Sequence, residues 1–369
     1  MYLISEASTS FEAFFVRVEC PARSAGAFAK DWLKAFATVC LVLTRLLMHV
    51  RLIDANSVGY AHHHAADQRF VGDMQTHAVH GLLWHIRRNL QIDPDMLNVL
   101  VWDGRAHWRY AMHPGYKAGR HRTAEQRETR RQYEAQRPLI QRALQNFPVL
   151  QVRVPDSEAD DLAWGLSRQL SAQGHRVTVF TADSDWLSMV NARTAWVNAR
   201  KPQQIIELDG FSKATGFPSP GQVAAIKALS GDDADDIEGV HDIGPKRAAA
   251  LIQRHGSLAG VFRAAQDIFT FSQEPKYFHA LMLAEVQERV LRNERLVDLS
   301  KGPALHSSSV ELQVGEYDPL ELYELFVDLE FKQWQESFPQ WEKVLSMEPP
   351  TANFLSVKRA LANLAQSWA

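Results

Sequence analysis

Three short apolar runs in the first half of the chain each lead into an acidic residue. The runs and their acids are 51–53 with Asp54, 97–102 with Asp103, and 177–181 with Asp183 and Asp185. Apolar runs of this length, bounded by turn-forming residues, are typical of buried strands. In an open parallel sheet, residues just beyond the carboxyl ends of the strands converge on one crevice. The pattern therefore predicts an α/β protein whose acids gather at one edge of a parallel sheet.

A helix is predicted between the second and third runs, over residues 158–173. Pro155 stands before it and Gly174 follows it, and both residue types are common at helix boundaries. A helix here would return the chain to the third strand in a βαβ-like step. Three acids fall in its first turn, the first and third of them on one face, and they are Glu158, Asp160 and Asp161.

Residues 231–251 combine an acidic turn with a glycine-bounded hairpin. Asp232 and Asp235 lie in the turn, and the hairpin runs from Gly239 to Gly244. The helix that follows begins with unpaired backbone N–H groups, which suit a phosphate. Its first turn adds two cations, which are Lys246 and Arg247. This pattern predicts a metal site joined to a clamp for a nucleic-acid backbone.

The acids described so far can share one site. They are Asp54, Asp103, Glu158, Asp160, Asp161, Asp183, Asp185, Asp232 and Asp235. For Asp54 or Asp103 taken singly, a turn former or helix cap is the better interpretation, but the joint pattern favours a shared site. So many carboxylates repel one another unless cations bind them, and oxygen ligands without Cys or His favour Mg²⁺ or Mn²⁺. Two such ions would support the hydrolysis of a phosphodiester.

Positive charge is concentrated in residues 104–153. This segment holds eleven Lys or Arg residues and three acids, although the whole chain has a formal net charge of −3. The cations are Arg105, Arg109, Lys117, Arg120, Arg122, Arg127, Arg130, Arg131, Arg137, Arg142 and Arg153, and the acids are Glu125, Glu128 and Glu134. The excess predicts a cationic clamp that faces the anionic pocket. The alternative is a solvated, Arg-rich helix that binds nothing.

Taken together and in this order, the motifs resemble the 5′ nucleases, a family that includes flap endonucleases, phage 5′-3′ exonucleases and the N-terminal domain of bacterial DNA polymerase I. The matching segments are 52–59, 101–104, 116–120, 158–161, 181–187 and 231–248, spread over roughly half of the chain. The resemblance implies a PIN-like parallel sheet flanked by helices, with a helix-three-turn-helix DNA-binding module. It also implies that the nine acids bind two Mg²⁺ or Mn²⁺ ions, directly or through water. The acids implied to lie nearer the second ion are Asp183, Asp185, Asp232 and Asp235.

The resemblance also implies which residues contact DNA. Tyr116, Lys117 and Arg120 match the family's Tyr-Lys-x-x-Arg at the base of a helical arch. There Lys117 and Arg120 would act as the catalytic cations on the scissile phosphate, and Tyr116 would stack on a base. The hairpin carbonyls are implied to hold a K⁺ ion against the duplex backbone. With Arg122 from the basic segment, the expected DNA-binding residues are Tyr116, Arg122, Gly239, Val240, Ile243, Gly244, Lys246 and Arg247.

Four positions depart from the family pattern, and they are Ala55, Ala61, Asp236 and Asp242. Ala61 stands where the family has an Arg that contacts phosphate. Candidates to replace that contact are His62, His63, His64 and Arg69. Asp236 is expected to add a charge beside the second ion. Asp242 can adopt the left-handed backbone of the hairpin, where a carboxylate would weaken binding to phosphate.

The leading hypothesis is a metal-dependent 5′ nuclease that removes nucleotides or flaps from DNA 5′ ends in replication or repair. It is expected to act as a monomer in the cytoplasm of a bacterium or of a phage-infected host. A PIN-like ribonuclease is the first alternative, which the hairpin clamp for duplex DNA argues against. A non-catalytic DNA-junction binder is the second. Such a binder should have lost some ligands, yet all nine acids and Lys117 are present.

Length and composition limit the architecture. The chain has 369 residues, 46% of them hydrophobic, which allows one sizeable α/β domain and smaller helical modules. Cys20 and Cys40 are its only cysteines, so the sequence supports neither a zinc site nor a structural disulfide, and a reducing cytoplasm is expected. No run reaches the roughly 18 uninterrupted apolar residues of a membrane span.

Four parts are expected along the chain. They are an N-terminal extension without a catalytic role over 1–47, a PIN-like catalytic domain over 48–209 with a basic arch at about 104–145, the helix-three-turn-helix module over 210–305, and a C-terminal helical segment over 306–369. Residues 209–221 read as the linker into the module. Aromatic residues in the last part are expected to form a helix core rather than to stack on bases, and they are Phe326, Phe331, Trp334, Phe338 and Trp341.

Overall fold

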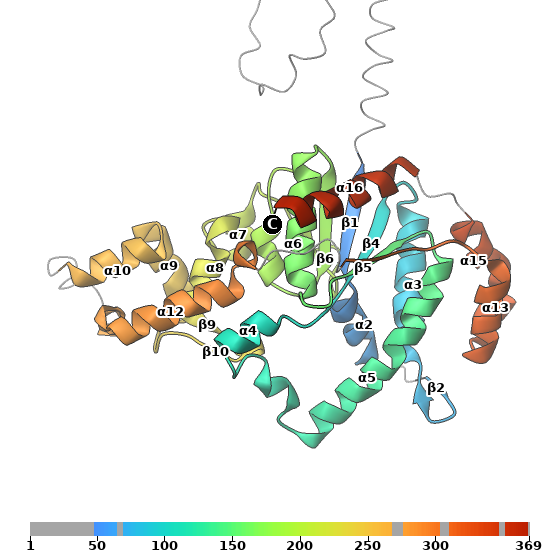
Figure 1. The fold of residues 1–369 in the computed structure, drawn as a ribbon, viewed down its shortest axis with the longest axis horizontal. Helices are drawn as coiled ribbons and strands as arrows, with labels where there is room; N and C mark the ends of the chain where they lie inside the picture. The colour runs from blue at the N-terminus through green and yellow to red at the C-terminus, as the bar shows by residue number, and fades with distance from the viewer. Residues whose placement is uncertain (1–47, 65–68, 268–275, 303–309, 347–350, 368–369) are drawn as a thin grey trace, which may run out of the picture. The chain divides into compact units, whose positions relative to one another are not determined.

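A seven-stranded sheet forms the centre of the part of the chain that the computed structural model describes, which is residues 48–64, 69–267, 276–302, 310–346 and 351–367 (Figure 1). In spatial order its strands are β11 (Glu311–Val314), β5 (Leu150–Arg153), β4 (Leu97–Trp102), β1 (His49–Asp54), β6 (Arg176–Thr181), β7 (Thr194–Asn198) and β8 (Ile205–Ile206). The five inner strands are parallel, and β11 and β8 pair antiparallel at the two edges. The α/β fold class predicted from the sequence is confirmed. The expected N-terminal extension and both cysteines lie outside the described residues.

The inner strands are apolar because both faces of the sheet are covered. All six residues of β4 are buried. Their side chains alternate between two hydrophobic cores, so that Val99 packs on one face and Leu100 on the other. Leu52 and Ile53 of β1 divide between the same two cores. This alternation sets which way the residue at each strand end points.

Helices cover both faces of the sheet (Figure 1). On one face lie α2 (Ala55–His63), α3 (His77–Ile92) and α5 (Ala124–Ala143), whose apolar residues share a core with Ile53 and Leu100. On the other face α6 (Ala159–Ala172) packs under Leu52 and Val99, and α16 (Thr351–Ser367) packs against α6. The long α5 begins with a capping box in which Thr123 and Gln126 bond each other's backbone, and this fixes the residue at which the helix starts.

A second helical module with its own core follows the sheet. Its helices are α8 (Val223–Ser230), α9 (Pro245–His255), α10 (Leu258–Gln266) and α12 (Ala284–Val297), and the short α7 (Phe211–Thr215) precedes them. Ile226, Val240, Ile252 and Val290 are among the residues of that core. The expected linker over 209–221 contains α7, bracketed by Gly210 and Gly216 in the left-handed conformation. Phe211 of α7 is buried in the core of the sheet, so the stretch that was read as a linker contains a helix that packs with the sheet.

The last part of the chain returns to the sheet. It begins with the edge strand β11, which was not expected in a C-terminal helical segment. It continues with α13 (Pro319–Asp328), α14 (Lys332–Glu336) and α15 (Phe338–Leu345). The expected aromatic core is confirmed, since Phe326, Phe331, Trp334 and Trp341 are buried and Phe338 packs against them. Among the described helices, none combines the length and the apolar character that crossing a bilayer requires.

Candidate active site

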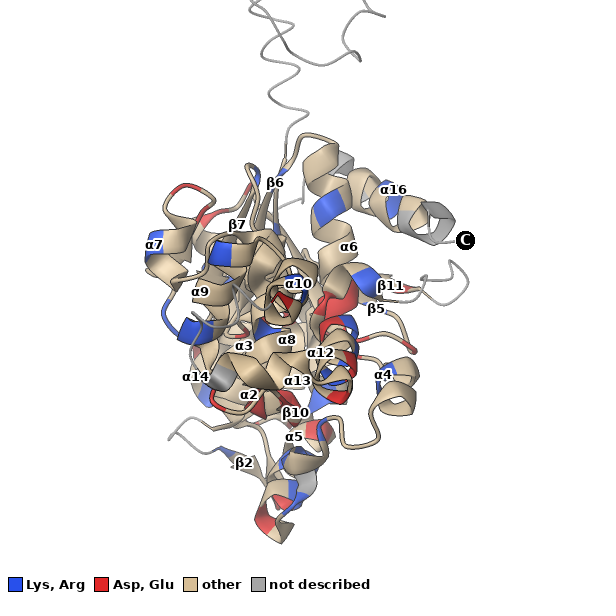
Figure 2. Cartoon of the chain, turned by 90° about the vertical axis from the view of Figure 1, so that its left-hand side faces the viewer, with Lys and Arg blue, Asp and Glu red and all other residues tan. Residues whose placement is uncertain are grey.

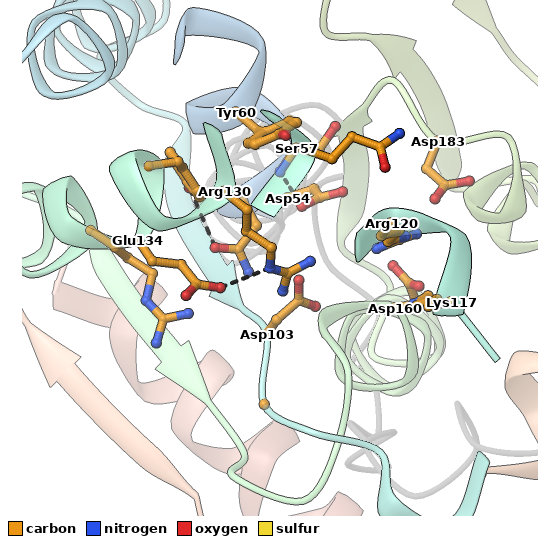
Figure 3. Close-up of a pocket in the computed structure, with 15 residues that line it drawn as sticks. Asp54, Ser57, Tyr60, Asp103, Lys117, Arg120, Arg130, Glu134, Asp160 and Asp183 are labelled. Atoms are coloured by element: carbon orange, nitrogen blue, oxygen red, sulfur yellow. Dashed lines mark hydrogen bonds and ion pairs between the residues drawn. The ribbon is translucent and has the colours of Figure 1, made fainter. Parts of the chain in front are cut away.

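The carboxyl ends of three neighbouring strands open into a pocket with a volume of about 450 Å³ (Figure 3). Asp54 ends β1, Asp103 follows β4, Asp183 follows β6, and Asp160 comes from the first turn of α6. The pocket also includes Asn56, Ser57, Tyr60, Gly104, Lys117, Arg120, Gln126, Arg130, Tyr133, Glu134 and Arg137. The structure thus brings four of the nine sequence-predicted acids onto one surface.

Asp54 is held by two hydrogen bonds at the base of the pocket. Its Oδ1 accepts the N–H of Ser57 at 2.9 Å, which caps α2, and its Oδ2 accepts the Thr181 hydroxyl at 2.8 Å. Burial, together with the neighbouring Asp103, raises the pKa of Asp54 to about 7. Being a helix cap and belonging to the acidic cluster are therefore compatible roles for this residue.

Asp103 connects the end of β4 to the start of α6. Its Oδ1 accepts the N–H of Ala159 at 2.9 Å, which supplies the helix with a cap that Glu158 at the cap position does not provide. Gly104 allows the two loops to meet, because a Cβ there would lie 2.0 Å from the carbonyl oxygen of Val154. The glycine thereby fixes the distance between Asp103 and α6.

Asp160 and Asp183 complete the acidic surface. The Trp186 indole donates to Asp160 Oδ1 at 2.7 Å, and the N–H of Asp185 donates to Asp183 Oδ1 at 2.9 Å. Burial, followed by repulsion from Asp183, raises the pKa of Asp160 well above its usual value. Burial also raises the pKa of Asp183, although Lys227 and Lys117 partly offset it. The pocket holds more negative charge than its neighbours neutralise.

The predicted catalytic cations stand at the pocket rim, already paired. Lys117 Nζ lies 2.7 Å from Glu158 Oε1 and 3.8 Å from Asp235 Oδ2, and Arg120 Nη2 lies 2.8 Å from Asp235 Oδ1. Burial would raise the pKa of Glu158, but the positive charges of Lys117 and Arg109 outweigh this effect and lower the pKa. The Tyr116 hydroxyl lies 2.9 Å from both Glu158 and Asp235, and its ring is 3% exposed, so stacking on a base would require the ring to move.

Asp161 faces away from the pocket. Arg109 on α4 (His107–Met112) binds it through two guanidinium nitrogens and also reaches Glu158 at 3.1 Å. Glu158 and Asp161 do share a helix face, as their spacing predicts, but that face meets an arginine. The structure therefore separates Asp160 from Asp161 within one turn of α6.

Two acids expected near a second ion share a lysine instead. Lys227 on α8 contacts Asp185 Oδ1 and lies 2.8 Å from Asp232 Oδ2. Burial would raise the pKa of Asp232, but this ammonium group outweighs the effect and lowers the pKa. Asp235 is bound from the opposite side by Tyr116 and Arg120.

Asp236 lies beside the arch base rather than beside the pocket. It adopts a left-handed backbone with φ 54°, and its Oδ2 accepts the N–H of Gly119 at 2.6 Å. Its Oδ1 pairs with Arg122, and His113 Nε2 lies 3.1 Å from its carbonyl oxygen. The charge expected beside the second ion is instead used to hold the 3₁₀ turn η2 (Ala118–His121), which carries Arg120.

The wall opposite the acids comes from α5. The basic segment expected to face the pocket included Arg130, Glu134 and Arg137, but Gln126 and Tyr133 were not singled out from the sequence. The residues of this wall are Gln126, Arg130, Tyr133, Glu134 and Arg137. Their spacing of three or four residues puts them on one face of a helix, a signal that was present in the sequence. Arg130 pairs with Glu134 at 2.8 Å (Figure 3). Tyr133 packs edge-on against Tyr60. Lys and Arg bands alternate with acidic ones along this helix (Figure 2).

The proposed substitutes for the family's missing arginine do not line this pocket. His63 is buried and stacks on His77 at 4.8 Å between ring centroids. Burial, helped by His77 and His64, lowers the pKa of His63 to about 4. His62, His64 and Arg69 are likewise absent from the residues that form the pocket. Arg130 and Arg137 supply cations on this wall instead.

The predicted hairpin lies between the acidic turn and α9. Val240 and Ile243 are buried in the module core, and the Ile243 N–H bonds the Val240 carbonyl at 3.0 Å. Asp242 has φ 63°, so it does take the left-handed conformation. The remaining predicted DNA contacts lie around this turn, with Gly239 before it, Gly244 as the cap of α9, and Lys246 and Arg247 exposed in the first turn of that helix.

In the described part of the chain, no group of three or more His, Cys, Asp or Glu side chains is close enough to hold a metal ion as it stands. The pocket acids are nevertheless all carboxylates. Asp103, Asp160 and Asp183 each have one oxygen held by a protein donor, and within the described residues the second oxygen accepts no hydrogen bond. Each therefore keeps an oriented oxygen for a hard cation.

Comparisons with known proteins identify relatives along most of the chain. The model for the 5′-3′ exonuclease N-terminal resolvase-like domain matches residues 49–216, and the model for the 5′-3′ exonuclease C-terminal SAM fold matches residues 218–320. DNA polymerase I of Streptococcus pneumoniae serotype 4 is 24% identical over 275 residues, which are 72% of this chain and 29% of the polymerase. This chain therefore spans less than a third of that relative.

Solved structures show the same fold. The T5 5′-exonuclease with bound zinc superposes with a TM-score of 0.58 at 17% identity, covering 86% of this chain and 99% of the exonuclease. Human GEN1 in complex with Holliday junction DNA superposes with a TM-score of 0.55 at 15% identity, covering 82% of this chain and 72% of that one.

Proposed function

The chain belongs to the 5′ nuclease family, and we propose that it hydrolyses phosphodiester bonds at 5′ ends and 5′ flaps of DNA with the help of divalent metal ions. One observation carries this proposal: Asp54, Asp103, Asp160 and Asp183 face Arg130 and Arg137 of α5 across one pocket. The acids provide a place for cations, and the arginines provide a place for the phosphate that those cations would act on. A protein that binds DNA without cleaving it would need only the place for the phosphate.

Mg²⁺ or Mn²⁺ suits the donor set, because the pocket offers carboxylate oxygens and no Cys or His. When bound, such ions activate a water and stabilise the charge that develops on the phosphate. The pocket supports a ligand role for Asp54, Asp103, Asp160 and Asp183. A role at a second ion remains a proposal for Asp185, Asp232 and Asp235, while Glu158 and Asp161 act through the cations that they hold.

Lys117 and Arg120 are proposed to stabilise the scissile phosphate. Both side chains reach the pocket, and each is balanced by Glu158 or Asp235 before substrate arrives. An entering phosphate would exchange one anionic partner for another, so the cations need not be desolvated from bulk water at that moment. Arg130 and Arg137 would hold the adjoining part of the strand from the α5 wall.

The second module is proposed to bind the duplex next to the cut. The exposed Lys246 and Arg247 stand in the first turn of α9, whose free N–H groups favour a phosphate. The separate cores of the sheet and of the module support a division into a catalytic domain and a DNA-binding module, with Phe211 and Val223 still on the side of the catalytic domain. A K⁺ ion bound by the hairpin carbonyls is part of this proposal, and the structures of relatives with DNA bound support the choice of DNA.

The test compares a 5′-flapped DNA duplex, a blunt duplex with a 5′ end and a hairpin RNA, each with Mg²⁺ and with EDTA. The native protein is set beside Asp183→Asn and a matched control, Asp209→Asn, whose side chain is exposed outside the pocket. Metal-dependent cutting of DNA that Asp183→Asn loses and Asp209→Asn keeps would support the proposal. The products from the two DNA substrates separate flap cleavage from exonuclease action. Cutting of RNA alone would indicate a ribonuclease, and tight flap binding without cutting in Mg²⁺ or Mn²⁺ would indicate a junction binder.

A further inference from the structure

Lys227 is the cation that joins the helical module to the acidic end of the sheet. It belongs to α8 of the module, and its ammonium group lies between Asp185, which begins the turn η4 (Asp185–Met189) after β6, and Asp232 in the acidic turn. The side chains of Lys227, Asp185 and Asp232 are 13%, 10% and 12% exposed. Water therefore contributes little to the stability of these charges, and the lysine must neutralise them.

The position of the ammonium group is one that a metal ion could otherwise take. Its nitrogen contacts one oxygen of each carboxylate, and the Asp232 contact is 2.8 Å long. An ion bridging the same two oxygens would overlap the lysine, because both need the space between them. A divalent ion added beside the ammonium would also face its positive charge at close range, which is strongly unfavourable with so little water.

Asp232 has further support that makes the arrangement specific. Its Oδ1 accepts the N–H of Ala234 at 3.0 Å, which turns Oδ2 toward Lys227. Asp185 follows Asp183 by two residues, and its N–H is bonded to Asp183 Oδ1, which orients the backbone of this turn. The acid pair is thus preset around the lysine, while Asp183 is left to the pocket.

We propose that Lys227 serves as a built-in cation: it holds Asp185 and Asp232 together in the absence of DNA, so that the free protein binds one divalent ion, at the Asp54–Asp103–Asp160–Asp183 pocket. A second ion between Asp185 and Asp232 requires the lysine to leave. This inference rests on the proposed function, since it assumes that the pocket takes the first ion. It predicts that the number of divalent ions bound by the DNA-free protein depends on the side chain of Lys227.

The test is a titration of the DNA-free protein with Mn²⁺, followed by electron paramagnetic resonance of the free ion, which counts bound ions without activity. The native protein is expected to bind one ion. Lys227→Met is expected to bind a second, with its affinity for that ion raised at least about tenfold, because one positive charge has been removed from a poorly hydrated position. The double variant Lys227→Met with Asp185→Asn should lose the second ion again.

Two controls separate this effect from misfolding and from nonspecific charge changes. Lys227→Arg keeps the positive charge and should bind one ion. Lys213→Met removes an exposed lysine on α7 and should also bind one. Two ions in the native protein, or one ion in a Lys227→Met protein with native circular dichroism, would overturn the role of the lysine while leaving the nuclease proposal intact. No bound ion in any of these proteins would overturn both.

Discussion

Arg109 and Asp161 form a two-pronged ion pair in which Nη1 lies 2.6 Å from Oδ2 and Nη2 lies 2.6 Å from Oδ1. The arginine is 1% exposed, and its Nε donates to the carbonyl of Leu296 at 3.0 Å. One side chain therefore joins the first turn of α6 to the end of α12 in the module. Because Asp160 lies in that same turn, the pair fixes which residue of α6 faces the pocket.

Replacing Arg109 should destabilise the protein far more than replacing a neighbouring arginine. Arg109→Met leaves Asp161 buried without a counter-charge, so we expect the free energy of unfolding to fall by about 3–5 kcal/mol. Arg105→Met is the control, because this arginine is exposed, and it should change the free energy of unfolding by less than about 0.5 kcal/mol. Urea denaturation followed by circular dichroism measures both. Equal midpoints for the two variants would contradict the structural role of Arg109.

The contact between Gly119 and Asp236 should control the arch base. A Cβ on Gly119 would lie 2.7 Å from both carboxylate oxygens of Asp236, so Gly119→Ala must shift that carboxylate, and with it the hydrogen bond and ion pair that hold the turn carrying Arg120. We expect kcat on a flap substrate to fall on the order of tenfold, because misplacing a positioned group costs that much or more. Gly115→Ala is the matched control, since its Cβ would meet only the tip of His113 at 3.3 Å. A similar kcat for the two variants would show that the turn tolerates displacement.

The sheet and its acids were predictable because the signals are local. An apolar run such as β4 ending at Asp103 identifies a buried strand and its terminus without knowledge of any partner. The basic segment was expected to face the acids, and Arg130 and Arg137 of α5 do line the pocket. Gln126 and Tyr133 were missed because charge was counted along the segment and the residues were not assigned to a helix face. Burial of Trp334 and Trp341 followed from their spacing.

The directions of individual acids were not predictable, because each depends on a partner far away in sequence. Asp161 turns from the pocket to meet Arg109, which precedes it by 52 residues. Asp236 turns toward Gly119 because its own backbone is left-handed. Residue identity allows that conformation for an aspartate but does not select it. The position of Lys227 between two acids likewise depends on how the module packs against the sheet.

Removing the charge of Lys117 should impair the chemical step more than metal binding. Lys117→Met takes away a cation that lies in the pocket and 2.7 Å from Glu158, so we expect kcat to fall on the order of a hundredfold. The control Lys201→Met removes an exposed lysine and should leave kcat unchanged. Single-turnover cleavage of a flap substrate gives the rate, and Mn²⁺ titration of the same protein gives its metal affinity. A loss of metal binding in Lys117→Met would point to a different role.

Two arginines six residues apart on α5 should behave differently toward DNA. Arg137 lines the pocket, whereas Arg131 pairs with Glu128 and does not. Arg137→Met should weaken flap binding and lower the slope of log affinity against log salt by about 1, as expected for one lost phosphate contact. Arg131→Met serves as the control and should leave the slope nearly unchanged. Fluorescence anisotropy at several salt concentrations measures it, and equal slopes would place the strand elsewhere.

The stability of the folded protein should depend on pH and metal together, because the pKa values of two pocket acids are raised. Burial and Asp103 raise the pKa of Asp54 to about 7, and burial and Asp183 raise the pKa of Asp160. In an unfolded chain such carboxyls titrate near pH 4. The folded, metal-free protein thus retains protons that the unfolded chain releases. This contribution to stability is complete below about pH 4 and is lost as pH rises through about 7.

A divalent ion binds the ionised carboxyls, so its stabilising effect should grow over the same range. We expect the rise in Tm on replacing EDTA with Mg²⁺ to be small at about pH 5 and larger at about pH 8. Asp54→Asn removes one titrating group and should flatten the fall of Tm with pH in EDTA, whereas Asp209→Asn should follow the native curve. Thermal melts across this range measure the effect. A Mg²⁺ shift that is constant with pH, or largest at low pH, would show that the ion does not bind these carboxyls.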